Sequence, residues 1–257
     1  MNAVAAVGID AGSTTAKAVA VDAGGGMVAS RLEPTRPRLE EQAAELIGAL
    51  ERDLHTAGAV PVVATGYGRR LVRDAARRVT EITCHARGVF RALGHGGTLV
   101  DIGGQDAKAI RISDDGKPVD FAMNDKCAAG TGRFLEHTAA RLGIAVDDLG
   151  ARALATDVEE PISSTCTVFA ESEIISLIGR GADVDEIVRG LHRSLVGRIV
   201  TMARLVGITP PLIVSGGVAL NPGVREMMSQ ATGFEVVLPP HPQLMGAYGA
   251  ALLGLDE

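Results

Sequence analysis

The strongest hint of chemistry in this sequence is an aspartate that follows a short apolar run and precedes small and hydroxyl-bearing residues. Residues 8–17 read GIDAGSTTAK, and residues 100–110 repeat the pattern as VDIGGQDAKAI. A turn of this composition offers backbone N–H groups and hydroxyls to phosphate oxygens, and its carboxylate can hold Mg²⁺ through water. We interpret the two stretches as facing turns that clamp a metal-bound polyphosphate.

Either turn alone has an ordinary structural explanation, because glycines interrupt hairpins and aspartates cap turns. Two such turns at matching strand ends favour phosphate binding instead. The candidate residues are Asp10, Gly12, Ser13, Thr14, Thr15 and Lys17 in the first turn, and Asp101, Gly103, Gly104, Gln105 and Asp106 in the second. Within this set, Asp10, Asp101 and Gln105 are the candidates for catalysis.

A third glycine-rich stretch, IVSGGVALNPGV at residues 213–224, joins an expected strand to an expected helix. Its backbone could approach an adenosine closely, with Gly216, Gly217 and Asn221 as the candidate contacts. The sequence contains no GxxxxGK motif followed by Ser or Thr, which excludes a Walker loop. Residues 130–134 read GTGRF without an expected strand before them, which argues against a dinucleotide fingerprint.

Two of the three cysteines occupy similar settings. Cys127 lies in NDKCAAGTGRFLE and Cys166 in SSTCTVFAESE, and each precedes an expected helix. The positive end of a helix dipole favours the thiolate, so both are credible anionic ligands. A free cysteine is also often just a small buried hydrophobe, and that alternative stays open for both. For Cys84, at a strand-to-helix junction, burial is the better interpretation.

The spacing of these thiols does not match a familiar metal site within one chain. Between Cys127 and Cys166 lie 38 residues, unlike a CxxC knuckle, and two thiolates do not complete a tetrahedral or iron–sulfur site. His137 and His192 could be recruited, but we expect both on helix surfaces. The simplest completion is a twofold dimer in which four cysteines surround one cluster.

Composition and charge narrow the classes of partner. The chain of 257 residues is 46% hydrophobic with a formal charge of -6, which argues against nucleic-acid binding. The arginine-rich residues 69–78 are interpreted as a solvated helix face. No basic-apolar leader and no apolar run of 18 residues is present, so we expect a cytoplasmic protein without a membrane partner.

The apolar periodicity predicts an α/β protein with an internal duplication. Residues 4–9 and 17–22 read as strands of a small antiparallel meander, followed by a helix at 40–56 and a strand within PVVATGYG. A second strand–turn–strand cycle starts at Thr98 and aligns with the first. Further helices are expected at 132–142, 167–178, 184–206 and 222–231, and a glycine-alanine helix at the carboxyl end.

No linker rich in Pro, Gly and Ser separates the lobes, so we expect hinges inside one body. Lobe I is predicted to comprise residues 1–85 with 239–257, and lobe II residues 86–238. The three glycine-containing segments in this order resemble those of the superfamily of sugar kinases, actin and heat-shock chaperones. That resemblance implies a two-lobed ATPase with ATP in the interlobe cleft, phosphate contacts from Ser13, Thr14 and Thr15, and metal and water at Asp10 and Asp101.

The complete set of motifs resembles a narrower family, the ATP-dependent activators of 2-hydroxyacyl-CoA dehydratases, grouped with the ATPase subunits of benzoyl-CoA reductase. The motifs are GIDAGSTTAK, ATGYGR, DIGGQDAKAI, NDKCAAGTGRFLE, SSTCTVFAESE and SGGVALN. The resemblance implies ATP or ADP with Mg²⁺, and a homodimer that shares one [4Fe–4S] cluster through Cys127 and Cys166. We also place Gly130 and Gly132 among the nucleotide contacts.

By the same resemblance, ATP hydrolysis drives one low-potential electron onto the dehydratase, and a ferredoxin or flavodoxin supplies it. We expect the coupling to run through the helices at 128–142 and 167–178. Three alternatives remain: a benzoyl-CoA reductase ATPase subunit, a small-molecule kinase with Glu171 or Glu173 as base, and a sensor dimer that binds ATP and zinc. No motif specifies the acyl-CoA of the downstream enzyme.

Overall fold

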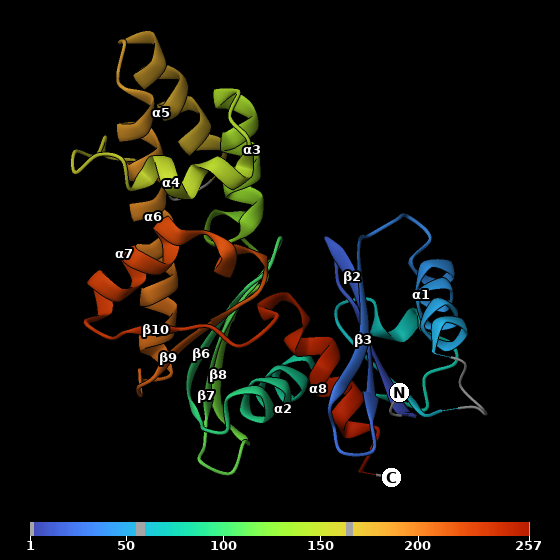
Figure 1. Cartoon of the computed structure of the whole chain (residues 1–257). Helices are drawn as coiled ribbons and strands as arrows, with labels where there is room; N and C mark the ends of the chain where they lie inside the picture. Colours follow the sequence, from blue (N-terminus) through green and yellow to red (C-terminus); the bar gives the residue numbers. More distant parts are fainter. Residues whose placement is uncertain (1–2, 55–59, 163–166, 257) are drawn as a thin grey trace. The chain divides into compact units, whose positions relative to one another are not determined.

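A computed structural model describes residues 3–54, 60–162 and 167–256 (Figure 1). The chain forms two compact units, one of Met1–Gly96, Ile112–Val119 and Pro239–Glu257, the other of Gly97–Arg111 and Asp120–Leu238. The division predicted from the sequence differs from these units in placing residues 86–96 and 112–119 in the second lobe. Among the described residues, no helix is both long and apolar enough to cross a membrane.

The first unit is built on a five-stranded sheet in the order β3-β2-β1-β4-β5. Strands β1 and β2 pair antiparallel, as do β2 and β3, whereas β1 and β4 are parallel. The expected antiparallel meander at the amino end is confirmed. The strands are β1 (Val4–Ala11), β2 (Thr15–Asp22), β3 (Met27–Pro34), β4 (Val62–Thr65) and β5 (Arg77–Arg78).

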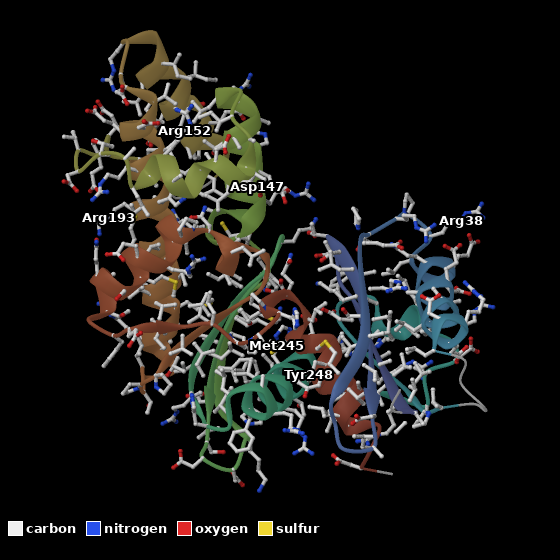
Figure 2. All side chains as sticks on the ribbon, viewed as in Figure 1. Arg38, Asp147, Arg152, Arg193, Met245 and Tyr248 are labelled. Carbon is white, nitrogen blue, oxygen red and sulfur yellow. The ribbon has the colours of Figure 1, made fainter. Side chains whose placement is uncertain are left out.

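The α-helices described in this unit are α1 (Leu39–Asp53), α2 (Glu81–Leu93) and α8 (Met245–Leu253). Helix α8 is apolar over nearly its whole surface and buried, as expected for a core helix. It packs closely on α2, since a Cβ added at Gly249 would lie 1.7 Å from the carbonyl oxygen of Cys84. The Tyr248 hydroxyl of α8 (Figure 2) donates to the Gly25 carbonyl at 2.8 Å.

The second sheet repeats the arrangement of the first in the order β8-β7-β6-β9-β10. Strand β6 corresponds to β1, and its neighbour β9 is parallel to it, as β4 is to β1. The internal duplication read from the sequence is therefore confirmed in the fold. The strands are β6 (Gly97–Ile102), β7 (Ala107–Ile112), β8 (Pro118–Asn124), β9 (Leu212–Ser215) and β10 (Val236–Val237).

Helices cover this second sheet, and α6 contributes many side chains to its core. Asp183 caps α6 by accepting from the backbone N–H groups of Asp185 and Glu186. The helices predicted at 132–142, 167–178, 184–206 and 222–231 are all present. Their observed bounds are α3 (Gly132–Leu142), α4 (Leu149–Ala153), α5 (Thr167–Gly179), α6 (Val184–Leu205) and α7 (Pro222–Thr232).

The interpretation of residues 69–78 as a helix face was wrong. Only a short 3₁₀ turn, Arg69–Leu71, forms there, and the segment ends in the two-residue strand β5. The Arg78 guanidinium donates to the carbonyl of Val72 at 2.7 Å, which satisfies backbone groups that a helix would have paired internally. The other 3₁₀ helices are Ala128–Gly130, Val146–Asp148, Gly217–Leu220 and Pro242–Leu244.

Candidate functional site

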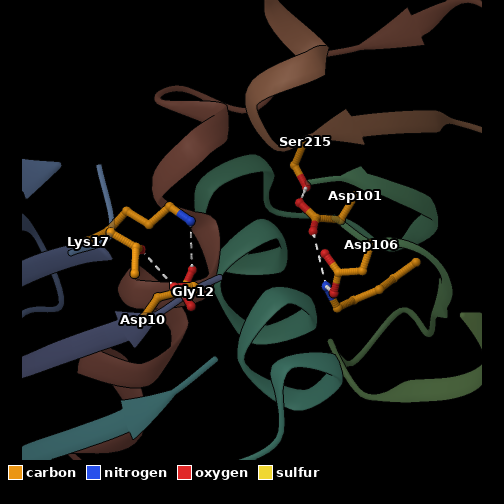
Figure 3. Close-up of polar contacts among 8 residues, drawn as sticks. Asp10, Gly12, Lys17, Asp101, Asp106 and Ser215 are labelled. Atoms are coloured by element: carbon orange, nitrogen blue, oxygen red, sulfur yellow. Dashed lines mark hydrogen bonds and ion pairs between the residues drawn. The ribbon is translucent and has the colours of Figure 1, made fainter. Parts of the chain in front are cut away.

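The first candidate aspartate lies at the carboxyl end of β1. Asp10 is 6% exposed, and in the strand register it faces Lys17 of β2 on one side and Thr65 of β4 on the other. Lys17 Nζ lies 3.2 Å from Asp10 Oδ2 (Figure 3). A buried carboxylate needs such a counter-ion, so the antiparallel pairing of β1 with β2 supplies it locally.

The second candidate aspartate has the same position in its own sheet. Asp101 of β6 is 4% exposed and faces Ser215 of β9, whose Oγ donates to Asp101 Oδ1 at 2.7 Å (Figure 3). Lys108 Nζ of β7 lies 3.7 Å from Asp101 Oδ2 and 2.6 Å from Asp106 Oδ2. Two carboxylates and a hydroxyl therefore converge on one end of this sheet.

The two sites are equivalent in more than their aspartates. In each copy a lysine follows the aspartate by seven positions, and a hydroxyl residue lies opposite it on a parallel strand. Each hydroxyl residue precedes a glycine with positive φ, 91° at Gly66 and 88° at Gly216. We call Asp10, Lys17, Thr65 and Gly66 the first quartet, and Asp101, Lys108, Ser215 and Gly216 the second quartet.

At both positions a side chain is excluded, because φ is positive and because neighbouring atoms leave no room for a Cβ. A Cβ at Gly66 would lie 2.4 Å from Asp10 Oδ1, and a Cβ at Gly216 would lie 2.3 Å from the Ile102 carbonyl oxygen. The sequence analysis missed Lys108, Thr65 and the role of Ser215. The signal for Lys108 was present, because it aligns with Lys17 in the repeated AKA segment.

The predicted phosphate contacts of the first turn lie between β1 and β2. Ser13, Thr14 and Thr15 are partly exposed, and Gly12 lies close to Lys17, since a Cβ there would be 3.3 Å from Nζ. Thr14 Oγ1 is buried and has no hydrogen-bond partner within the described parts of the chain. A hydroxyl in this state is suited to donate to an oxygen that arrives with a ligand.

The second turn is bound directly to the start of helix α3. The Gly103 N–H closes the turn by donating to the Asp106 carbonyl, whereas Gln105 is exposed at its tip. The carbonyls of Gly103 and Gly104 accept from the N–H groups of Gly132 and Arg133, each at 2.8 Å. The first N–H groups of a helix need external acceptors, and the turn provides two. Gly132 is thus placed against the turn itself.

In the third glycine stretch, the side chain of Asn221 is already engaged. Its Oδ1 accepts from the Val224 N–H and caps α7, and its Nδ2 lies 3.0 Å from His192 Nε2. His192 Nδ1 lies 2.8 Å from the Val188 carbonyl oxygen, so Nδ1 carries the proton and Nε2 accepts from Asn221. His192 is fully buried on α6, and the expectation that it lies on a helix surface was wrong.

Of the predicted cluster ligands, Cys127 is described and partly exposed, whereas Cys166 lies outside the described residues. Asn124 holds the backbone of Cys127 from both sides, accepting from its N–H at 3.2 Å and donating to its carbonyl at 2.7 Å. A Cβ at Gly130 would lie 3.3 Å from Asn124 Nδ2, so this glycine packs beside the same asparagine. Asn124 is a positioning residue that the sequence analysis missed.

The remaining thiol and the acidic residues add no metal site of their own. Cys84 is fully buried in the first turn of α2, and burial raises its pKa to about 12, as expected for a structural thiol. In the described part of the chain, no three His, Cys, Asp or Glu side chains are grouped so as to hold a metal ion.

Comparison with known proteins adds the family. Residues 7–254 match the model of the BadF/BadG/BcrA/BcrD ATPase family. The chain belongs to this family. A relative from Clostridioides difficile, the "2-hydroxyisocaproyl-CoA dehydratase activator", is 40% identical over 98% of this chain and 95% of its own length. Another relative, a benzoyl-CoA reductase chain of Thauera aromatica, is 35% identical over 75% of this chain and 70% of its own length.

Solved structures place this member of the BadF/BadG/BcrA/BcrD family in the expected fold. Component A of the (R)-2-hydroxyglutaryl-CoA dehydratase of Acidaminococcus fermentans has a TM-score of 0.91, is 39% identical and is matched over 98% of this chain and 97% of that chain. The Clostridium difficile activator with bound ADPNP has a TM-score of 0.87, 40% identity and coverage of 98% and 94%.

A more distant likeness supports the fold alone. A ROK family glucokinase from Streptomyces griseus has a TM-score of 0.61 at 16% identity, with coverage of 98% of this chain and 99% of that chain. The expected fold class, an α/β body of the sugar kinase and actin-like type with a duplicated core, is confirmed for this BadF/BadG/BcrA/BcrD ATPase.

The buried His192 predicts a pH dependence of stability. Burial lowers its pKa from 6.5, so below pH 6.5 the unfolded chain takes up a proton that the folded chain does not. The free energy of unfolding should therefore fall by up to about 1.4 kcal/mol per pH unit below 6.5. Urea unfolding of the native protein and of His192→Gln should show this slope only in the native protein.

A His137→Gln variant is the matched control, because the His137 side chain is 50% exposed and should leave the slope unchanged. Equal acid slopes in the native protein and in His192→Gln would contradict the assignment of a neutral, buried imidazole.

Proposed function

We propose that the protein is an ATP-hydrolysing iron–sulfur protein that transfers a low-potential electron to a 2-hydroxyacyl-CoA dehydratase. The observation that carries the proposal is the 40% identity with a dehydratase activator over 98% of this chain. The two quartets and Cys127 supply the side chains that such a function requires. The electron donor in this proposal is a ferredoxin or flavodoxin, and the compartment is the cytoplasm.

ATP with Mg²⁺ fits the oxygen-rich ends of both sheets. The carboxylates of Asp10 and Asp101 are hard oxygen ligands of the kind that Mg²⁺ prefers, directly or through water. In the proposal Asp10, Asp101 and Gln105 serve the metal and the attacking water. The unpartnered Thr14 hydroxyl and the ammonium of Lys17 are placed to meet phosphate oxygens at the first turn.

The roles assigned to the glycines are less uniform. Gly12, Gly103 and Gly104 expose backbone of the turns, which suits contact with phosphates. Gly216 and Gly217 follow a strand end and keep the proposed role at the adenosine. The contacts of Gly130 and Gly132 support a structural role behind Cys127, and the side chain of Asn221 supports the adenosine loop through α7 and His192.

The thiol of Cys127 fits one ligand position of a cluster, because it is partly exposed and its backbone is fixed by Asn124. In the proposal Cys127 and Cys166 of two copies hold one [4Fe–4S] cluster, which when bound stores and releases one electron. The chain's own contribution is to place Cys127 directly before the 3₁₀ turn Ala128–Gly130 that leads into α3.

The second turn and Cys127 are connected through a short path. The carbonyls of Gly103 and Gly104 hold the first N–H groups of α3, and Cys127 lies five residues before that helix. At the far end of α3, the Arg141 guanidinium pairs with Glu171 of α5. A change at the second turn on hydrolysis would therefore reach the helices that flank both cysteines, as a two-state element would require.

A homodimer is supported by the surface of α5. The residues Ala170, Ile174 and Leu177 pack into the core, yet Phe169, Ile175 and Ile178 of the same helix are 68%, 48% and 45% exposed. Large apolar side chains exposed together on one helix mark a surface suited to contact with another protein. Because α5 begins directly after Cys166 in the sequence, a second copy seated on α5 would lie next to a proposed cluster ligand.

The small-molecule kinase is less well supported. The hydrogen bond from the Arg141 guanidinium lowers the pKa of Glu171, and a carboxylate held ionised by an ion pair is a poor general base. The benzoyl-CoA reductase ATPase subunit remains the second candidate, since a chain of such an enzyme is 35% identical over 75% of this chain. Metal analysis distinguishes the third alternative, a sensor that would contain zinc, from an iron–sulfur protein.

Replacement of Cys127 by Ser should remove iron and acid-labile sulfide from anaerobically purified protein. The reason is that one of the two thiolates that each chain contributes would be lost. ADP binding should persist, because the quartets are untouched. Cys84→Ala is the matched control and should retain full iron, since Cys84 is buried and structural. Zinc in place of iron, or iron retained in the Cys127→Ser protein, would refute the cluster proposal.

Replacement of Phe169 by Glu should produce a monomer that has lost its iron. A charge at a side chain 68% exposed in one chain is tolerated by the fold but not by an apolar interface. Light scattering after size exclusion measures the mass. Leu205→Glu, at the 75% exposed end of α6, should remain a dimer with iron. A Phe169→Glu protein that stays dimeric would show that α5 is not the interface.

A further inference from the structure

Lys108 belongs to the second quartet but has been given no role of its own, and it is among the most buried side chains in the described part of the chain. It is 2% exposed, and its ammonium lies 2.6 Å from Asp106 Oδ2 and 3.7 Å from Asp101 Oδ2. Transfer of an ammonium from water to the protein interior is costly unless its charge is compensated. The two carboxylates therefore compensate the buried charge of Lys108.

The equivalent lysine of the first quartet is in a different environment. The Lys17 side chain is 16% exposed and pairs with the single carboxylate of Asp10 at 3.2 Å. The charges of that pair balance, whereas Asp101, Asp106 and Lys108 together keep one negative charge. Asp106, which adds a second carboxylate beside the second quartet, thus makes this sheet end suited to a cation, whereas the first quartet, with one carboxylate per lysine and nearby hydroxyls, suits phosphate.

We infer that Lys108 is a positioning residue that takes, in the protein without nucleotide, the electrostatic place of the divalent cation. Its ammonium holds Asp101 and Asp106 side by side and keeps their affinity for free Mg²⁺ low. The cation then enters together with the phosphates of ATP, whose charge offsets that of the lysine. The inference rests on the proposed use of these carboxylates in holding Mg²⁺.

The test is a titration of nucleotide-free protein with Mn²⁺ alone, in which electron paramagnetic resonance reports free Mn²⁺. Lys108→Met keeps the length of the side chain and removes its charge. The dissociation constant for Mn²⁺ should fall about tenfold or more, because a like charge a few ångströms from the cation is removed. At the same time kcat for ATP hydrolysis should fall, whereas KM for MgATP should not rise. If Lys108 were only structural, its replacement by Met would not lower the dissociation constant for Mn²⁺.

Three variants serve as controls. Lys108→Arg keeps the charge and should bind Mn²⁺ like the native protein. Lys17→Met should raise KM for MgATP, because it removes a proposed phosphate contact. Lys117→Met removes an exposed lysine that lies 2.7 Å from Asp115 and should change neither quantity.

If Lys108→Met does not fold, Lys108→Gln takes its place in the titration. Mn²⁺ affinity that is unchanged or weaker in the folded neutral variant overturns the inference, as does a lack of Mn²⁺ binding by both proteins. A native protein without ATP hydrolysis would refute the proposed function, whereas tighter Mn²⁺ binding by the neutral variant in that same experiment would still support the charge compensation by Lys108.

Discussion

The structure depends on the burial of an aspartate carboxylate at the end of a central strand. Asp10 and Asp101 are 6% and 4% exposed, and a charge so deeply placed requires a counter-ion and hydrogen-bond donors nearby. The antiparallel neighbour of the first aspartate strand supplies Lys17, and the parallel neighbour of the second supplies Ser215. The aspartate strand lies in the middle of each sheet, so neighbouring strands on both sides can supply such partners.

Short contacts connect the buried Asp101 with the other residues proposed to act in the function. The second turn, fixed by the contacts of its aspartates, holds the amino end of α3 through two backbone hydrogen bonds. The segment before that helix carries Cys127, clamped by Asn124. The second turn, proposed to contact phosphate, and Cys127, proposed to bind a cluster, are thus connected through backbone contacts, which transmit displacement more directly than flexible side chains would.

Much of this arrangement could be predicted from the sequence, because it rests on local patterns. The repeated strand–turn–strand unit and the helix at 132–142 each depend on neighbouring residues. The quartets could not be predicted in full, since Asp10 meets Thr65 and Asp101 meets Ser215 only through parallel pairing of strands far apart in the chain. Such registers leave no local signal.

Two predictions from the sequence were wrong for the same reason, namely contacts that local patterns do not reveal. Residues 69–78 have helical composition, but side-chain to backbone hydrogen bonds from Arg78 hold the segment in an irregular conformation. His192 follows a polar helix pattern, yet Asn221 from a distant loop provides the partner that permits its burial. The role of Cys166 stays a prediction, because this residue lies outside the described part of the chain.

The central claim is that both buried aspartates are needed for the hydrolysis of ATP and neither for the binding of iron. The most direct measurement is the rate of ATP hydrolysis by Asp10→Asn and by Asp101→Asn, each purified without oxygen and assayed for iron. The account predicts that each variant keeps its iron and loses hydrolysis by about a hundredfold or more, as expected for loss of a metal or water ligand. Near-native hydrolysis by either iron-containing variant would contradict it.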